Sequence, residues 1–84
     1  MRRLSPARDR ELRHAEAGHV AWRHSYVRSA KYAWCRFCER EVSRQMYWLV
    51  NAGFIEAYDS DLRFHFLAPK VTDHARLYLE EFPK

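Results

Sequence analysis

Apolar residues in the middle of the chain recur at helical spacing. Val42, Met46 and Leu49 lie at i, i+4 and i+7, which places them on one side of a helix and predicts a buried stripe over about residues 38–52. Gly53 follows this stripe. Because glycine tolerates the left-handed conformation that ends many helices, we expect the helix to stop there.

After this helix the pattern becomes that of two strands and a closing helix. Residues 54–58 and 62–67 predict a two-stranded hairpin with its turn at 59–61, where Asp, Ser and Asp are typical turn residues. Thr72 is a suitable N-cap for a last helix, whose main apolar residues are Leu77 and Leu79.

The N-terminal part predicts a helix followed by a strand. Ser5 and Pro6 are a helix-start pair, and Gly18 a stop, so we expect a helix over residues 6–17. Residues 19–27 alternate with period two, which indicates a strand with Val20 and Trp22 facing the core.

Residues 30–37 allow two interpretations. Tyr32 and Trp34 favour a second strand that completes a hairpin over residues 19–37. Ser29 is also a suitable N-cap, and the same segment then forms a short helix. The 84 residues contain no internal repeat, so we expect one α+β domain, near the size at which a single core is just sufficient.

The order of elements after residue 39 resembles the second half of a winged helix-turn-helix domain, and is similar in particular to small phage and actinobacterial regulators. The resemblance is carried by Leu49 four residues before Gly53, the pair Phe54-Ile55, the turn, and Thr72 after Val71. It implies about three helices and a two-stranded wing, and in such regulators a hairpin, like the extra one expected here at 19–37, can replace the usual second helix. It also implies double-stranded DNA binding, as in a transcriptional regulator of phage or bacterial type. In such regulators the C-terminal helix often carries a dimer contact, which here would involve Leu79 and Phe82.

Charge is distributed unevenly along the chain, whose net charge is +4. Residues 1–36 contain nine Lys and Arg against three Asp and Glu, whereas residues 37–84 contain six against eight. A basic first half is compatible with a nucleic acid partner. It is equally compatible with a solvated charged face.

The face of the 38–52 helix opposite its apolar stripe carries residue types that contact DNA bases and phosphates. For the major groove we predict Arg40, Ser43, Arg44 and Tyr47, with Asn51 on the same face. For the phosphates we predict Arg36, Arg23, Arg28 and Lys31, with Arg63 on the wing. Asp59 and Asp61 at the wing tip depart from the Lys, Arg or Gly expected of a phosphate-gripping wing.

A second interpretation assigns the chain to protein recognition. Tyr47, Trp48 or Trp34 would then anchor a partner, as in a phage protein that binds and modulates a host enzyme. The acidic wing tip favours this alternative.

Cys35 and Cys38 form the one spacing that resembles a metal motif. A zinc site would need two more ligands from His14, His19, His24, His65 or His74, and the chain has no second closely spaced pair of the kind that structural zinc motifs show. We therefore expect no metal and no cofactor, with zinc on the two cysteines as the alternative.

Enzymatic motifs are missing from the sequence. It has no glycine-rich phosphate loop and no nucleophile elbow, so we expect a non-enzymatic protein. No apolar run approaches the roughly 20 residues that span a bilayer, and the N-terminal residues lack the apolar core of a secretion signal. We expect a cytoplasmic protein without a membrane partner.

Overall fold

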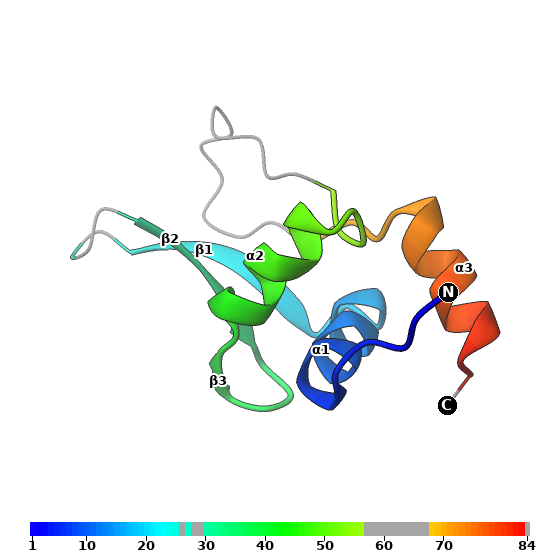
Figure 1. Cartoon of the computed structure of the whole chain (residues 1–84). Coiled ribbons are helices and arrows are strands. Elements are labelled where there is room, and N and C mark those ends of the chain that lie inside the picture. The colour runs from blue at the N-terminus through cyan, green and yellow to red at the C-terminus, as the bar shows by residue number, and fades with distance from the viewer. Residues whose placement is uncertain (26, 28–29, 57–67, 84) are drawn as a thin grey trace.

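A computed structural model describes residues 1–25, 27, 30–56 and 68–83. Within these residues the fold is α+β, with three helices and a three-stranded antiparallel sheet (Figure 1). The elements in chain order are α1 (Pro6–Glu16), β1 (Val20–Ser25), β2 (Ala30–Cys35), β3 (Arg40–Glu41), α2 (Ser43–Asn51) and α3 (Asp73–Glu81).

The hairpin predicted at 19–37 is confirmed, and the short-helix interpretation of residues 30–37 is wrong. β1 and β2 pair antiparallel, with Val20 opposite Cys35 and Trp22 opposite Ala33. Directly opposed residues share a face of the sheet, and all four of these side chains are buried. The face of β1 that carries Val20 and Trp22 is therefore the core face, as predicted.

The helix predicted over 38–52 begins at Ser43, five residues later than predicted. Residues up to Glu41 form a tight turn and β3, in which Arg40 pairs with Cys35 of β2. Glu39, at φ 53°, occupies the left-handed region that makes this turn. Local propensity allowed a helix here, but hydrogen bonding to the free edge of β2 decided the conformation. Arg36 and Arg40 consequently lie on the turn and on β3, not on the helix.

The predicted starts of α1 and α3 and the predicted stops after α1 and α2 agree with the structure. The Ser5 hydroxyl accepts a hydrogen bond from Arg8 N, and the Thr72 hydroxyl accepts one from Ala75 N. Gly18 and Gly53 have φ of 81° and 85°, which is the conformation expected after α1 and α2.

The core forms where α1 and α2 pack on the sheet and α3 packs against α1. Leu12 of α1, Met46 and Leu49 of α2, and Tyr78 of α3 are fully buried around it. The hairpin extends to one side of the molecule and α3 lies on the other (Figure 1). No helix in the described part of the chain has the length and apolar character needed to cross a bilayer.

The prediction that Leu77 and Leu79 are the main apolar residues of α3 is partly wrong. Leu77 is 58% exposed, whereas Ala75 and Tyr78 are the buried residues of this helix. Leu79 and Phe82, the predicted dimer contacts, pack partly against the chain's own core. Leu77 is therefore the only large apolar residue of α3 whose side chain is mainly exposed.

The residues on either side of the predicted wing lie next to each other. Ile55 and Val71 form an antiparallel bridge, and Glu56 N donates to Lys70 O at 2.8 Å. The two segments therefore leave and rejoin the core side by side. The rest of the predicted wing, residues 57–67 with the turn at 59–61 and Arg63, falls outside the described residues, so the predicted pairing of 54–58 with 62–67 stays a prediction.

Candidate functional site

Two hydrogen bonds hold α2 against β2. The Ser43 hydroxyl accepts from Ala33 N at 2.8 Å, and the Tyr47 hydroxyl donates to Lys31 O at 3.1 Å. From Ser43 to Tyr47 the helix advances about 6 Å, and from Ala33 to Lys31 the strand advances about 6.6 Å. Because the two distances are similar, both bonds can form when α2 runs antiparallel to β2. Ser43, predicted to contact bases, thus has a structural use for its hydroxyl.

The outer face of α2 is formed by residues spaced along one side of the helix. Arg44, Tyr47 and Asn51 are exposed at i, i+3 and i+7. The exposure predicted for these three residues is confirmed, although the Tyr47 ring also packs on Trp22 at a centroid distance of 5.3 Å. Ser43 is only half-exposed and turns towards β2.

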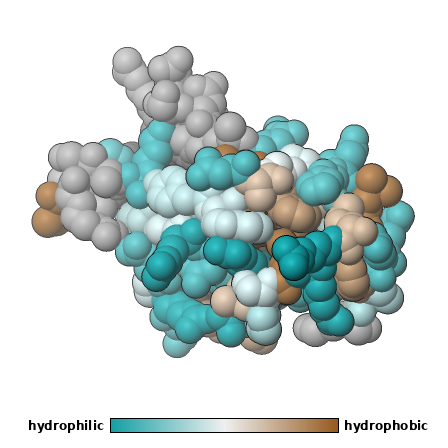
Figure 2. Space-filling model, in the orientation of Figure 1, coloured by the Kyte–Doolittle hydropathy of each residue, from teal (hydrophilic) through white to brown (hydrophobic). Residues whose placement is uncertain are grey.

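Three exposed arginines come from consecutive elements around the start of α2. Arg36 lies on the β2–β3 turn, Arg40 on β3 and Arg44 in the first turn of α2. None of them forms an ion pair within the described part of the chain. Hydrophilic residues dominate the α2 and β3 side of the face in Figure 2, whereas hydrophobic residues gather towards α3. On the other helices, Arg10 pairs with Glu11, Arg13 with Asp9 and Arg76 with Asp73, whereas Arg8 packs over the Trp48 ring.

The N-terminus of α2 differs from those of the other two helices. Its N-cap residue is Val42, which has no side-chain oxygen to accept from the first-turn N–H groups, whereas Ser5 and Thr72 cap α1 and α3. No acidic residue lies in its first turn. An uncapped helix N-terminus is favourable for an anion, because its N–H groups and dipole face outwards.

The other predicted phosphate and anchor residues are more enclosed. Arg23 is half-buried, with its guanidinium 5.6 Å from the centroid of the Trp34 ring. Trp48 is covered by Arg8 at 3.8 Å and stacks with Phe54. Lys31 is half-buried on β2, and Arg28 lies outside the described residues. The tryptophans predicted as protein anchors therefore pack within the chain.

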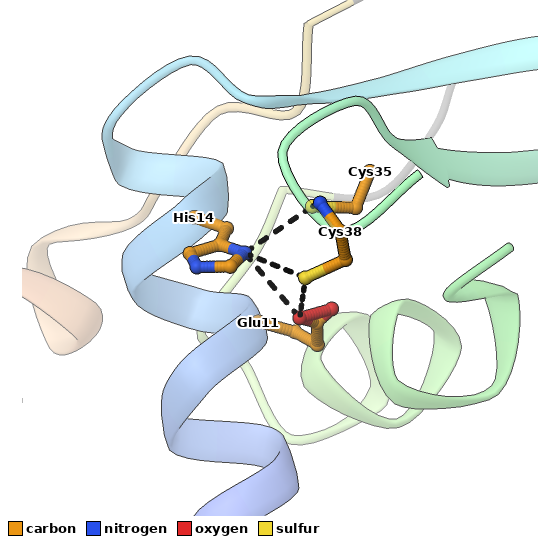
Figure 3. Close-up of side chains that lie close together, drawn as sticks. All are labelled: Glu11, His14, Cys35 and Cys38. Atoms are coloured by element: carbon orange, nitrogen blue, oxygen red, sulfur yellow. Dashed lines mark hydrogen bonds and ion pairs between the residues drawn. The ribbon is translucent and has the colours of Figure 1, made fainter. Parts of the chain in front are cut away.

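A separate cluster joins α1 to the β2–β3 turn. Glu11, His14, Cys35 and Cys38 each direct one ligand-type atom towards the same point, and these atoms all lie within 4.8 Å of one another (Figure 3). His14 Nδ1 is 3.2 Å from Cys35 Sγ and 3.4 Å from Cys38 Sγ. Glu11 Oε1 is 3.5 Å from the same nitrogen and 3.9 Å from Cys38 Sγ.

The electrostatics of this cluster are unusual for a chain interior. The Glu11 side chain is 0% exposed, and its Oε2 has no hydrogen-bond partner within the described part of the chain. Partial burial, the hydrogen bond with Cys35 and the Glu11 carboxylate all raise the pKa of the Cys38 thiol, while Arg40 acts in the opposite direction. Cys38 N donates to Cys35 Sγ at 3.4 Å.

Two members of the cluster are not singled out by the sequence. His14 is only one of five candidate histidines, and Glu11 has the ordinary explanation of an acidic residue early in its helix. Their spacing at i and i+3 places both on one helix face, which is the available signal. The spacing does not show that this helix face packs against a turn more than twenty residues later in the sequence.

No protein-family model matches the chain, and comparisons with curated proteins and with solved structures find no significant similarity.

Proposed function

We propose that the chain is a winged-helix-like domain that binds double-stranded DNA through the N-terminal end and outer face of α2, as a transcriptional regulator would. The observation that carries this proposal is a set of exposed arginines, Arg36, Arg40 and Arg44, which have no ion-pair partner among the described residues and lie on the β2–β3 turn, on β3 and in the first turn of α2, whose N-terminus has no side-chain cap. Phosphate oxygens match both the guanidinium groups and the open N–H groups.

The outer stripe of α2 supplies the groups that read bases. Arg44 matches the paired acceptors of guanine, and Asn51 has the amide that pairs with adenine. The antiparallel bridge between Ile55 and Val71 supports a wing that starts directly after this helix. The base contacts predicted for Ser43 and Arg40 are not retained, because the Ser43 hydroxyl binds β2 and Arg40 lies on β3, before α2.

Fluorescence anisotropy with a random duplex at two salt concentrations tests the proposal. We expect affinity to fall steeply with salt, because bound phosphates release counterions. Arg44→Ala should weaken duplex binding by roughly 1–3 kcal/mol and relax the preference at one base position, because Arg44 is proposed to contact guanine.

Arg76→Ala is the matched control. It removes the same charge from an exposed position on α3, where Arg76 pairs with Asp73 at 2.8 Å. Equal losses in the two variants would indicate a net-charge effect and no defined interface. Absence of any salt-dependent binding would refute the proposal, and a stoichiometric protein partner without DNA affinity would favour the protein-recognition alternative.

A further inference from the structure

The geometry points to a structural zinc site formed by Glu11 and His14 of α1 with Cys35 at the end of β2 and Cys38 of the β2–β3 turn, a role that we propose independently of DNA binding.

The separations between the ligand atoms match a tetrahedral zinc shell. With Zn–S of about 2.3 Å and Zn–N and Zn–O of about 2.0–2.2 Å, neighbouring ligand atoms in a tetrahedron lie about 3.4–3.8 Å apart. Four of the six separations among His14 Nδ1, Glu11 Oε1 and the two sulfurs are 3.2, 3.4, 3.5 and 3.9 Å, and the remaining two, from Cys35 Sγ to Cys38 Sγ and to Glu11 Oε1, are within 4.8 Å. A single ion at the centre of the cluster can therefore reach all four residues after a side-chain adjustment of about 1 Å.

Burial of Glu11 provides a second, independent reason for a cation. A carboxylate with 0% exposure, one of whose oxygens has no partner among the described residues, is costly to bury. Arg10 Nε contacts the other oxygen, Oε1, but only at 3.4 Å and from a side chain that is 45% exposed. A divalent ion between Glu11 and the two thiols would compensate the buried negative charge directly.

The donor set selects the metal. Two thiolates, one imidazole and one carboxylate are typical of zinc, whereas calcium and magnesium require mostly oxygen ligands. Zn²⁺ with three anionic ligands leaves a net charge of about −1 in this shell. Arg10 beside Glu11 and Arg40 near Cys38 are placed to balance that charge.

The surroundings orient the ligands. Cys38 N donates to Cys35 Sγ at 3.4 Å, a contact that stabilises a thiolate at the first cysteine. The Phe37 ring meets the edge of His14 at a centroid distance of 5.0 Å and stacks on His19 at 5.3 Å. Four protein ligands leave no open coordination position, so the site would connect α1 to the turn and not catalyse a reaction.

Metal titration of the reduced, chelator-stripped full chain tests this site. Zn²⁺ should bind at one equivalent per chain, and Co²⁺ in its place should give the absorption of a tetrahedral ion together with thiolate charge-transfer bands. Glu11→Gln and His14→Gln should each weaken Co²⁺ binding by roughly tenfold or more, since even residues that only support a ligand contribute 10–100-fold. Cys38→Ser should reduce the charge-transfer intensity by about half, because only one of the two thiolates remains.

His19→Gln is the control, because this ring lies 5.7 Å from His14 and outside the cluster. It should retain both stoichiometry and spectrum. The proposal is overturned if wild-type protein gives no thiolate charge-transfer band with Co²⁺. It is equally overturned if Glu11→Gln and His14→Gln, with wild-type circular dichroism, bind Co²⁺ as tightly as the wild type. The wild-type titration decides the question even where a cysteine variant fails to fold.

Discussion

Replacement of Tyr78 by Phe removes one hydroxyl from the interior and should destabilise the fold substantially. Tyr78 is fully buried, and its hydroxyl donates to Asp9 Oδ2 at 2.6 Å while it accepts from Leu4 N at 3.1 Å. The hydroxyl therefore connects α3 to both α1 and the N-terminal segment. The substitution leaves the ring packing intact, so the change in stability reports on the two hydrogen bonds.

The size of the destabilisation follows from the two groups that lose a hydrogen bond to the hydroxyl, the Asp9 carboxylate and Leu4 N. A hydrogen bond to a charged group contributes about 1.5–3 kcal/mol, and a part-buried N–H without its acceptor costs about 1 kcal/mol or more. Asp9 keeps Arg13, whose Nε donates to it at 2.8 Å, which limits the destabilisation. We expect about 2–3 kcal/mol at pH 7, or a fall in Tm of roughly 10–20 °C for a domain of this size.

The destabilisation should depend on pH in a defined direction. Partial burial acts to raise the pKa of Asp9, but the hydrogen bonds from Arg13 and Tyr78 outweigh it, and the pKa lies below its ordinary value of 3.8. A lowered folded-state pKa stabilises the fold above the unfolded-state value, and this stability is lost as pH falls through the folded-state pKa. Without the Tyr78 hydroxyl the shift shrinks, so the difference between variant and wild type should narrow below about pH 4.

Urea denaturation at pH 7 and at about pH 2.5 measures both effects. Tyr47→Phe is the matched control, because its hydroxyl makes one bond, to Lys31 O, on a side chain that is 46% exposed. It should cost less than about 1 kcal/mol with little pH dependence. A Tyr78→Phe destabilisation equal to that of Tyr47→Phe, or one that does not change with pH, would refute the proposed role of Asp9.

Four further outcomes are expected. Ser43→Ala leaves Ala33 N without its acceptor and should cost about 1–3 kcal/mol in urea denaturation. Leu49→Ala, at a side chain with 0% exposure, should cost about 2–5 kcal/mol by the same assay, and an effect below about 1 kcal/mol would contradict its place in the core. Chelator should lower the Tm, because zinc at about 100 times its Kd stabilises a folded site by about 2.7 kcal/mol; an unchanged Tm after metal removal would count against the site. Arg40→Ala should lower the salt slope of duplex binding by about one, and an unchanged slope would remove Arg40 from the interface.

Local sequence signals predicted those parts of the fold that local chemistry determines. Ser5, Gly18, Gly53 and Thr72 mark helix ends, because each acts on backbone groups only a few residues away. Strict alternation predicted β1 and its buried face. These features need no knowledge of the rest of the chain.

Errors arose where a distant partner decides the structure. The residues before Ser43 have a helical pattern, yet Arg40 and Glu41 complete the edge of β2. Leu77 is as apolar as any residue in α3, but the packing direction of the helix buries Tyr78 in its place. The cluster with His14 was missed for the same reason, since its members meet only after α1 packs against the turn.

The proposed metal site and the proposed DNA surface share one short segment. We therefore expect metal binding to affect DNA binding, whereas a DNA contact on α2 should not affect metal binding. Arg36 lies between the cysteine ligands, and Arg40 follows Cys38 by two residues. A metal that fixes this turn would also fix both arginines relative to α2, so its removal should weaken duplex binding in addition to destabilising the fold. Arg44 stands on α2 outside the turn, so Arg44→Ala should weaken duplex binding while zinc stoichiometry stays at that of the wild type. Loss of zinc binding in this variant would mean that the turn and α2 form a single cooperative unit.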